Sequence, residues 1–312
     1  MPDHADVVDA RRCHTPGLWT TPTPGSSPSD LWETLGVPVF DRDGVLIHHE
    51  MFGDADGERP RVLFFNGSGA TLESAAPMIG YLARSCTVLA HDQRGLGRTS
   101  VPPGPYSMAD YAADAAALLD HVGWRTCAVF GISFGGMVAQ EFAVTHPDRV
   151  DAMVLFCTSA GGAAGSSYPL HELAGLEPAE RARRAALLTD TRFTPEWLAD
   201  HPDDAAIVRV QNERAAAVKS AEQVRGERTQ LAARIGHDVA DWLARITAPV
   251  LVSAGRFDGI APVANSESIV SRLGDASLAV YEGGHMFSLQ DRRAMRDAVE
   301  FLVSGIRPTH VN

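Results

Sequence analysis

The chain has 312 residues with 27 basic and 39 acidic side chains, which gives a formal net charge of −12 at pH 7. This balance argues against a nucleic-acid partner, because affinity for a phosphate backbone comes mainly from clustered Lys and Arg. The sequence has no run of about 20 apolar residues and its first six residues are polar and acidic, so we expect no membrane anchor, no secretory leader and a cytoplasmic location.

Residues 1–36 are rich in proline, glycine, serine and threonine. Such a composition cannot bury enough apolar surface to order itself. We therefore predict a flexible N-terminal extension, although Trp19 or Trp32 offers an apolar side chain that can dock on the rest of the protein.

Short β-rich runs alternate with helical segments over residues 37–158. We expect strands at 37–40, 45–51, 61–66, 87–91, 126–131 and 150–156, and helices between them, notably at 108–121 and 133–145. This alternation is typical of a mostly parallel sheet with helices on both faces. Residues 37–158 are thus predicted to form the first part of an α/β core.

Ser133 lies in the pentapeptide Gly131-Ile132-Ser133-Phe134-Gly135, between an expected strand and an expected helix. A nucleophile on a tight strand-to-helix turn has strained backbone angles, and only glycines fit two positions to either side of it. A serine hydroxyl is a poor nucleophile unless a base and an orienting acid accompany it. Ser133 is therefore a candidate nucleophile that requires two partners later in the chain.

Residues 159–246 carry no strand pattern. The segment opens with a glycine- and alanine-rich stretch and continues with helix-forming runs at 178–188, 195–200 and 204–234. Thr194 before Pro195 is a typical cap and first-turn pair for the second of these helices. We predict an all-helical insert between the sixth and seventh strands.

The strand pattern resumes at residues 247–312, which we expect to complete the core, with strands at 249–255 and 277–281. Asp258 follows the first of these strands and His285 follows the second, after two glycines. The carboxyl ends of parallel strands share one edge of a sheet. We therefore expect Ser133, Asp258 and His285 to converge as nucleophile, orienting acid and general base.

These motifs, in this order, resemble those of serine hydrolases of the α/β-hydrolase family over about residues 37–303. Residues 62–69 are similar to the family's third strand and oxyanion loop, and residues 91–100 to the turn after its next strand. The resemblance implies an oxyanion hole made of the main-chain N–H groups of Ser68 and Phe134. It also implies that the insert at 159–246 is a cap that roofs the pocket and selects substrates. Most relatives have His where this chain has Asn66, so we expect a different hydrogen-bond pattern in that loop.

The resemblance implies hydrolysis of a small carboxylic ester or lactone through an acyl-enzyme, as in small esterases and enol-lactone hydrolases. Carbon–carbon bond hydrolysis, proline iminopeptidase action and cofactor-free perhydrolysis use the same triad and stay open. A non-catalytic small-molecule receptor is the alternative from another class.

The expected partner is a small-molecule substrate, and self-association into a homo-oligomer stays open. We expect no cofactor, because Gly95-Leu96-Gly97 lacks the third glycine of a dinucleotide-binding loop. We also expect no metal, because His48 and His49 alternate across a strand and cannot chelate from one face. The four cysteines show no paired spacing and are expected to be reduced thiols; they are Cys13, Cys86, Cys127 and Cys157.

Overall fold

The computed structural model describes residues 38–54 and 58–308 of the chain. The flexible extension predicted for residues 1–36 lies outside the described residues, and so does Cys13. All elements named below belong to the compact unit that begins at Pro38.

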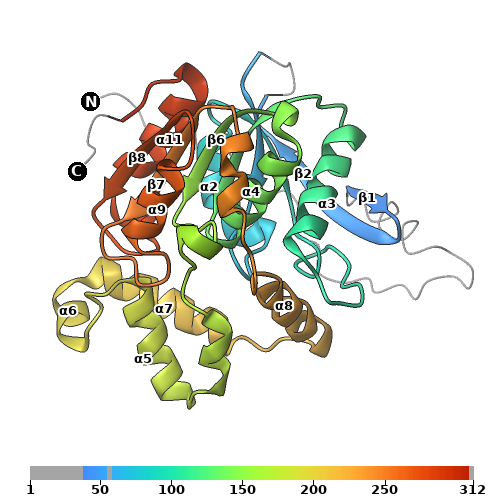
Figure 1. The fold of residues 1–312 in the computed structure, drawn as a ribbon. Helices are drawn as coiled ribbons and strands as arrows, with labels where there is room; N and C mark the ends of the chain where they lie inside the picture. Colours follow the sequence, from blue (N-terminus) through green and yellow to red (C-terminus); the bar gives the residue numbers. More distant parts are fainter. Residues whose placement is uncertain (1–37, 55–57, 309–312) are drawn as a thin grey trace, which may run out of the picture. The chain divides into compact units, whose positions relative to one another are not determined.

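An eight-stranded sheet forms the centre of this unit, with strand order β1-β2-β4-β3-β5-β6-β7-β8 (Figure 1). β2 pairs antiparallel with β1 and β4, and every other neighbouring pair is parallel. The predicted mostly parallel sheet is therefore confirmed. The strands are β1 (Val39–Arg42), β2 (Val45–Phe52), β3 (Arg61–Phe65), β4 (Thr87–His91), β5 (Cys127–Ile132), β6 (Val150–Phe156), β7 (Val250–Gly255) and β8 (Ala276–Tyr281).

The strand predicted at 37–40 was placed too early. Asp43 and Gly44, with φ of 51° and 85°, form a two-residue turn that pairs Arg42 with Val45. A two-residue turn fixes the register of a hairpin, so β1 must extend to the residue before the turn.

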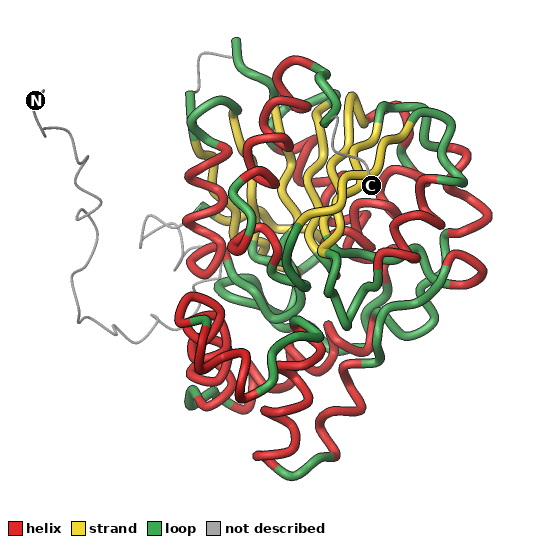
Figure 2. The backbone as a smooth tube through the Cα atoms, turned by 90° about the vertical axis from the view of Figure 1, so that its left-hand side faces the viewer, coloured by secondary structure: helices red, strands yellow, loops and turns green. Residues whose placement is uncertain are grey.

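Helices cover both faces of the sheet, as predicted (Figure 2). Alternation along β3 shows why: Leu63 and Phe65 belong to one apolar cluster, whereas Val62 and Phe64 belong to the other. The first cluster includes side chains of α3 (Met108–His121), α4 (Phe134–Thr145) and α9 (Val263–Val270), and the second includes those of α2 (Leu72–Leu82), α10 (Phe287–Gln290) and α11 (Arg293–Ser304).

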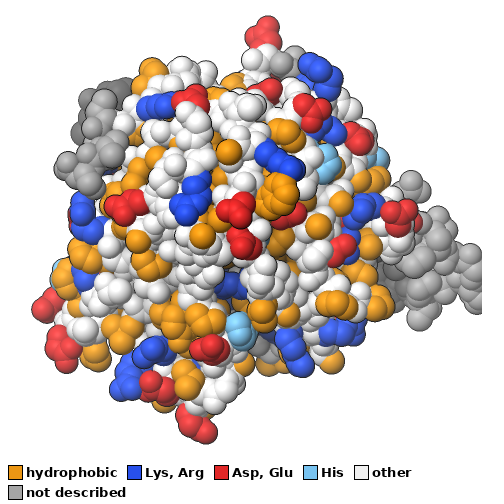
Figure 3. Space-filling model, viewed as in Figure 1, with side chains coloured by type: hydrophobic (Ala, Val, Ile, Leu, Met, Phe, Trp, Pro, Cys, Tyr) orange, Lys and Arg blue, Asp and Glu red, His pale blue; other side chains and the backbone are white. Residues whose placement is uncertain are grey.

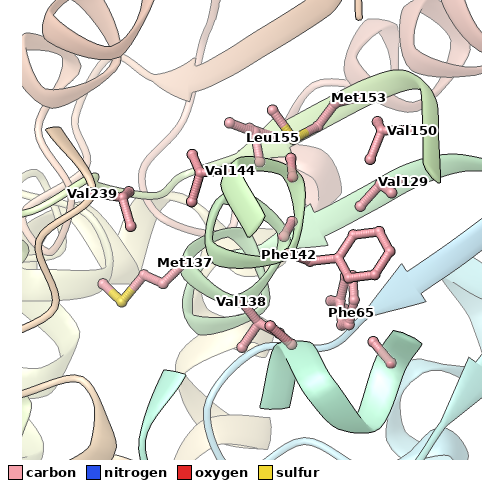
Figure 4. Close-up of a cluster of buried hydrophobic side chains, with 14 of the residues drawn as sticks. Phe65, Val129, Met137, Val138, Phe142, Val144, Val150, Met153, Leu155 and Val239 are labelled. Atoms are coloured by element: carbon pink, nitrogen blue, oxygen red, sulfur yellow. The ribbon is translucent and has the colours of Figure 1, made fainter. Parts of the chain in front are cut away.

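α4 is the helix that follows Ser133, and it is packed on nearly all sides. Figure 4 shows Phe142 and Phe65 together on one side of this helix, while Met137 lies on the side of Val239. Phe65 is fully buried, as is Phe142. Ser133 thus precedes a helix that cannot shift without disrupting the core.

The chain between β6 and β7 forms four α-helices, which lie beyond one end of the strands (Figure 1). The described residues of this insert form no strand, and an isolated bridge between Gly161 and Asp238 joins its two ends. The helices are α5 (Pro178–Thr189), α6 (Pro195–Asp200), α7 (Pro202–Ala216) and α8 (Ala221–Ala233).

The single helical run predicted at 204–234 is wrong, because the chain forms two helices there. Ser220 begins α8 with a reciprocal cap, in which its Oγ accepts from Gln223 N at 3.1 Å and Gln223 Oε1 accepts from Ser220 N at 2.8 Å. A capping box starts a new helix and so separates it from the preceding one.

Acidic and basic side chains are interspersed on the face of the molecule shown in Figure 3. Over the residues that the structure places, no helix combines the length and the apolar character needed to cross a membrane.

His91, at the end of β4, makes the stability of the fold dependent on pH. The ring is buried, it packs edge-on against Phe65 at a centroid distance of 5.8 Å, and its Nδ1 has no hydrogen-bond partner among the described residues. Burial lowers the pKa of His91 from 6.5 to about 4, against the opposing effect of Asp114 and Asp92.

The unfolded chain therefore takes up a proton near pH 6.5, whereas the folded protein does so only near pH 4. The stability that depends on the neutral ring is complete above pH 6.5 and is lost as the pH falls toward 4. Between about pH 7.5 and about pH 5, we expect the unfolding free energy of wild type to fall by roughly 2 kcal/mol more than that of His91→Gln. Urea titrations at the two pH values measure this difference, and equal losses in both proteins would contradict it.

Candidate active site

Ser133 lies on the sharp turn between β5 and α4, with φ 53° and ψ −115°. This conformation is disfavoured for a residue with a side chain, so the surrounding structure must hold it. Ser133 N–H donates to the carbonyl of Phe156 at 2.8 Å, and the Ser133 carbonyl accepts from Thr158 Oγ1 at 2.8 Å. The last residue of β6 and the segment after it therefore fix the turn.

The glycines around Ser133 are required by close packing. A Cβ atom on Gly135 would lie 2.2 Å from the carbonyl oxygen of Phe65, and one on Gly131 would lie 2.6 Å from that of Gly135. Without side chains, α4 approaches the end of β3 directly. This contact brings the loop that follows β3 next to Ser133, since a Cβ on Gly67 would lie 3.9 Å from Ser133 Cβ.

The side chains of Ser133, His285 and Asp258 form a continuous hydrogen-bond chain. His285 Nε2 lies 2.9 Å from Ser133 Oγ, and His285 Nδ1 lies 2.8 Å from Asp258 Oδ2. The other carboxylate oxygen of Asp258 accepts from the N–H groups of Ile260 and Ala261, at 2.7 and 2.9 Å. Two main-chain donors thus orient the carboxylate, and the carboxylate in turn orients the imidazole.

The loop predicted to supply an oxyanion donor, called the oxyanion loop below, runs from Asn66 to Gly69. Asn66 Nδ2 donates to the Thr71 carbonyl at 2.9 Å, and Asn66 Oδ1 accepts from Gly67 N–H at 3.1 Å. The Asn66 side chain therefore forms two hydrogen bonds to the main chain of its own loop. These bonds are the pattern that Asn forms where most relatives have His. Gln93 Nε2 donates to the Asn66 carbonyl at 2.7 Å and fixes the base of the loop.

The N–H groups of Ser68 and Phe134, predicted to form the oxyanion hole, donate to no other residue that the structure describes. Ser68 Oγ is also without a partner within the described range, although it is buried. Gly69 N–H, in contrast, donates to Gln230 Oε1 of α8 at 2.8 Å. The insert thus holds the loop, while the two candidate oxyanion donors remain available.

The insert also holds the loop that carries His285. His285 N–H donates to the carbonyl of Thr189, the last residue of α5, at 2.5 Å. Gln290 Oε1 accepts from Gly284 N–H at 2.9 Å, while its Nε2 donates to Asp190 Oδ2 at 3.0 Å and to Asp204 Oδ1 at 3.1 Å. Arg192 pairs with the fully buried Asp190, with its Nη2 at 2.6 Å from Oδ2.

Sequence reasoning did not find the residues through which the insert reaches the site. Gln230, Asp190 and Gln290 are single polar residues in helices or loops, and no local pattern marks them. Thr158, whose hydroxyl bonds to the Ser133 carbonyl, lies directly after β6 and is likewise marked by no pattern.

Cys157, Asp258 and His285 each offer a potential metal ligand, and these atoms lie within 4.8 Å of one another. Burial raises the pKa of the Cys157 thiol well above its ordinary value, and the nearby Asp258 raises it further. A thiol is a metal ligand as its thiolate, which this environment disfavours. Because Asp258 and His285 already bond to each other and to other groups, the three residues fit a proton-transfer site better than a metal site.

Comparisons with known proteins agree with this geometry. A family model described as alpha/beta hydrolase fold matches residues 60–291. The chain is 31% identical over 257 residues to 3-oxoadipate enol-lactonase 2 of Acinetobacter baylyi, a match that covers 82% of this chain and 92% of that protein. It is also 31% identical over 242 residues to a poly(3-hydroxyalkanoate) depolymerase of Ectopseudomonas oleovorans, covering 75% of this chain and 81% of that protein.

Solved structures give the same result. A hydrolase from Pseudomonas aeruginosa matches with a TM-score of 0.70 and 28% identity, covering 85% of this chain and 97% of that one. The enol-lactonase from Burkholderia xenovorans matches with a TM-score of 0.69 and 21% identity, covering 85% and 99% of the two chains. At the identity of the second match, the likeness shows the fold alone.

Proposed function

Because this chain belongs to the α/β-hydrolase family, we propose that it is a serine hydrolase of small carboxylic esters or lactones, with Ser133 as nucleophile. The observation that carries the proposal is the hydrogen-bond chain from Ser133 Oγ through His285 to Asp258, at 2.9 and 2.8 Å. Two relatives are named for an enol-lactone and for a poly(3-hydroxyalkanoate), and both of these substrate types contain carboxylic ester bonds.

In the first half of the reaction, Ser133 Oγ attacks the carbonyl carbon while its proton moves to His285 Nε2. The carbonyl oxygen becomes an oxyanion, and the N–H groups of Ser68 and Phe134 supply the two donors that stabilise it. Asp258 accepts from His285 Nδ1 and stabilises the imidazolium. When the tetrahedral intermediate collapses, His285 gives its proton to the leaving alkoxide and an acyl-enzyme remains.

In the second half, water takes the place of the alcohol. His285 removes a proton from water, hydroxide adds to the acyl carbonyl, and the same two N–H groups stabilise the second oxyanion. Collapse returns the proton to Ser133 Oγ and releases the acid. For a lactone, the alcohol and the acid leave as one molecule, because the ring joins them.

The proposed partner is a small-molecule substrate. The insert bonds to the oxyanion loop through Gln230 and to the histidine loop through Thr189, so it borders the site on two sides. We propose that it acts as a cap that limits which substrates reach Ser133. The cytoplasmic location stays a prediction from the sequence.

Stopped-flow hydrolysis of nitrophenyl esters of increasing chain length, with lactones and a proline arylamide in parallel, tests this function. We expect turnover of esters or lactones, with a burst of nitrophenol equal to the enzyme concentration wherever deacylation is the slower step. Turnover of the arylamide alone would indicate peptidase action instead. Inactivity on the whole panel, together with no labelling by a fluorophosphonate, would overturn the proposal.

A further inference from the structure

A cavity of about 140 Å³ lies where the insert joins the core. Its walls come from α4, the chain just after β6, residues 166–171 and the turn after α8. The described residues that line it include no member of the Ser133–His285–Asp258 hydrogen-bond chain and none of the oxyanion loop. The cavity is therefore separate from the candidate active site, and both ends of the insert contribute to its walls.

Arg234 supplies a positive charge to this cavity. Among the residues that the structure describes, no carboxylate forms an ion pair with Arg234. Its Nη2 donates to Ser167 Oγ and to the Tyr168 carbonyl, the latter at 2.9 Å, whereas its Nε and Nη1 donate to no described residue. Burial lowers the pKa of Arg234 to about 10, so the guanidinium is charged at neutral pH but poorly solvated. Such a guanidinium, with donors to spare, is suited to bind an anion.

Ser159 offers a second donor in the cavity lining. The residue is only 1% exposed, and its hydroxyl has no hydrogen-bond partner within the described part of the chain. A buried polar atom without a partner is costly in a folded protein, and it marks a place where a ligand or water completes the bonding.

His237 places an acceptor in the same lining. The residue is 9% exposed, and its Nε2 has no partner among the residues described. The other side of the ring bonds to the Ser159 carbonyl, which can only accept, so in the neutral ring Nε2 carries no proton. Burial lowers the pKa of His237 to about 4, which keeps the ring neutral at pH 7. An anion that satisfies Nε2 must therefore bring a proton of its own.

The acidic side chain that acts on His237 is Asp238. Its carboxylate is directed elsewhere, since Oδ1 accepts from Ala240 N–H at 3.1 Å, and the residue is exposed. Asp238 contributes nothing to the environment of Arg234. The anion-attracting charge of Arg234 is therefore left intact.

This set of two donors and one acceptor discriminates among small anions. Sulfate and carboxylates carry no proton near neutral pH, so their lone pairs would oppose that of His237 Nε2. A phosphate monoester has lost nearly all of its last proton at pH 8, because the pKa of that proton is about 6. Inorganic phosphate keeps one P–OH group at the same pH. Its hydroxyl can donate to His237 Nε2 while its charged oxygens accept from Arg234 and Ser159.

We propose that this cavity binds inorganic phosphate as the hydrogen phosphate ion. Arg234 and Ser159 donate to its charged oxygens, and its P–OH group donates to His237 Nε2. Because residues from both ends of the insert hold one ion, and the unfolded chain has no such site, bound phosphate stabilises the folded protein. This inference goes beyond the proposed hydrolase function and does not depend on it.

Calorimetric titration in Tris chloride at pH 8 compares phosphate with sulfate, which has the same tetrahedral shape but no proton. We expect wild type to bind phosphate at least about 10-fold more tightly than sulfate. The melting temperature should also be higher in phosphate than in sulfate of equal ionic strength. Equal affinity for the two ions would overturn the proposal, because it would show that Arg234 attracts any anion. Absence of phosphate binding would overturn it as well, and water would then complete the bonding of Ser159 and His237.

Ser159→Ala tests the site with little risk to the fold, because the hydroxyl that it removes bonds to no described residue. We expect its melting temperature without phosphate to equal that of wild type, and its affinity for phosphate to fall by about 10-fold. Ser277→Ala removes a buried hydroxyl of β8 that likewise has no partner among the described residues, and as the matched control it should bind phosphate normally. His237→Phe removes the acceptor and should bring the affinities for phosphate and sulfate to within about twofold of each other. Unchanged phosphate affinity in both Ser159→Ala and His237→Phe would contradict the assignment.

Arg234→Gln should weaken phosphate and sulfate binding alike, by about 10- to 100-fold, because it removes the charge. Arg228→Gln, at an exposed position of the same helix, is its control and should leave both affinities unchanged. Should Arg234→Gln fail to fold, Arg234→Lys keeps the charge without the planar fork and should bind phosphate more weakly than wild type. Glycerol phosphate at pH 8 should bind more weakly than inorganic phosphate, and tighter binding of this monoester would overturn the assignment of the ligand.

Discussion

Replacement of Ser133 by alanine is expected to lower kcat/KM for ester hydrolysis by about 10⁴- to 10⁶-fold. The reason is that the change removes the only atom that forms the covalent intermediate, while the oxyanion donors and the binding surface stay in place. The fold should be unaffected, because the main-chain bonds of Ser133 hold the turn and alanine keeps the same Cβ. Initial rates on the best ester, with the melting temperature of both proteins, measure the two effects.

Fluorophosphonate labelling separates this role from a general effect on the site. Wild type should be labelled and Ser133→Ala should not. Ser271→Ala, a change of the same kind at an exposed residue after α9, should behave as wild type in both assays. A folded Ser133→Ala protein that retains near-normal turnover would falsify the nucleophile assignment.

Local sequence patterns were enough to find the residues of the hydrogen-bond chain. Gly131 is required by the strand–turn–helix unit itself, since a Cβ there would lie 2.6 Å from the Gly135 carbonyl oxygen, and Gly135 is required by β3, since a Cβ there would lie 2.2 Å from the Phe65 carbonyl oxygen. Both glycines lie within two residues of Ser133, so they appear as a short motif. Asp258 and His285 follow strands that neighbour each other in a parallel sheet, and such strands end at one edge. The order of the strands in the sheet therefore brings these residues close together, whatever conformation the loops adopt.

The support of the site could not be found in the same way. The bond from Gly69 to Gln230 joins residues 161 positions apart, and that from Gln290 to Asp190 joins residues 100 positions apart. Each depends on how the insert folds back on the core, which no local pattern encodes. A glutamine on a helix is usually exposed, so nothing in the sequence distinguishes Gln230 from its neighbours.

The errors at element boundaries have a different origin, because their signals were present in the sequence. Ser220 and Gln223 have the spacing of a capping box, which marks the start of α8 inside the run that was read as one helix. Asp43-Gly44 is a typical two-residue hairpin turn and fixes the end of β1. At Ser220 the capping box interrupts a composition that favours one helix, whereas at β1 the turn extends the strand through Asp41 and Arg42.

The insert contacts both loops that lie beside Ser133. One main-chain N–H group of each loop donates a hydrogen bond to it: Gly69 N–H to Gln230 Oε1, and His285 N–H to the Thr189 carbonyl. If the insert moved away, both N–H groups would lose these partners and bond to water instead, so each hydrogen bond contributes about 0.5 to 1.5 kcal/mol to holding the insert in place. We therefore expect the contact with the insert to stabilise the present positions of His285 and of the loop at residues 66–69.

Asp258→Asn is expected to reduce kcat by about 10³- to 10⁴-fold with little change in the fold. The amide oxygen can still accept from the N–H groups of Ile260 and Ala261, so the side chain should keep its orientation. The amide nitrogen then faces His285 Nδ1, where the carboxylate oxygen Oδ2 had been. Because that nitrogen donates, Nδ1 must become the acceptor and the proton moves to Nε2, where it prevents the imidazole from accepting the Ser133 proton.

Single-turnover kinetics on the best ester measure this loss, and Asp151→Asn at an exposed position of β6 is the control. The two variants change the same functional group, so a difference between them reports the position and not the chemistry of the substitution. Near-normal activity of folded Asp258→Asn would show that His285 keeps its tautomer without the carboxylate. The carbonyl of Thr189, which holds the main chain of His285, would then be sufficient to position the base.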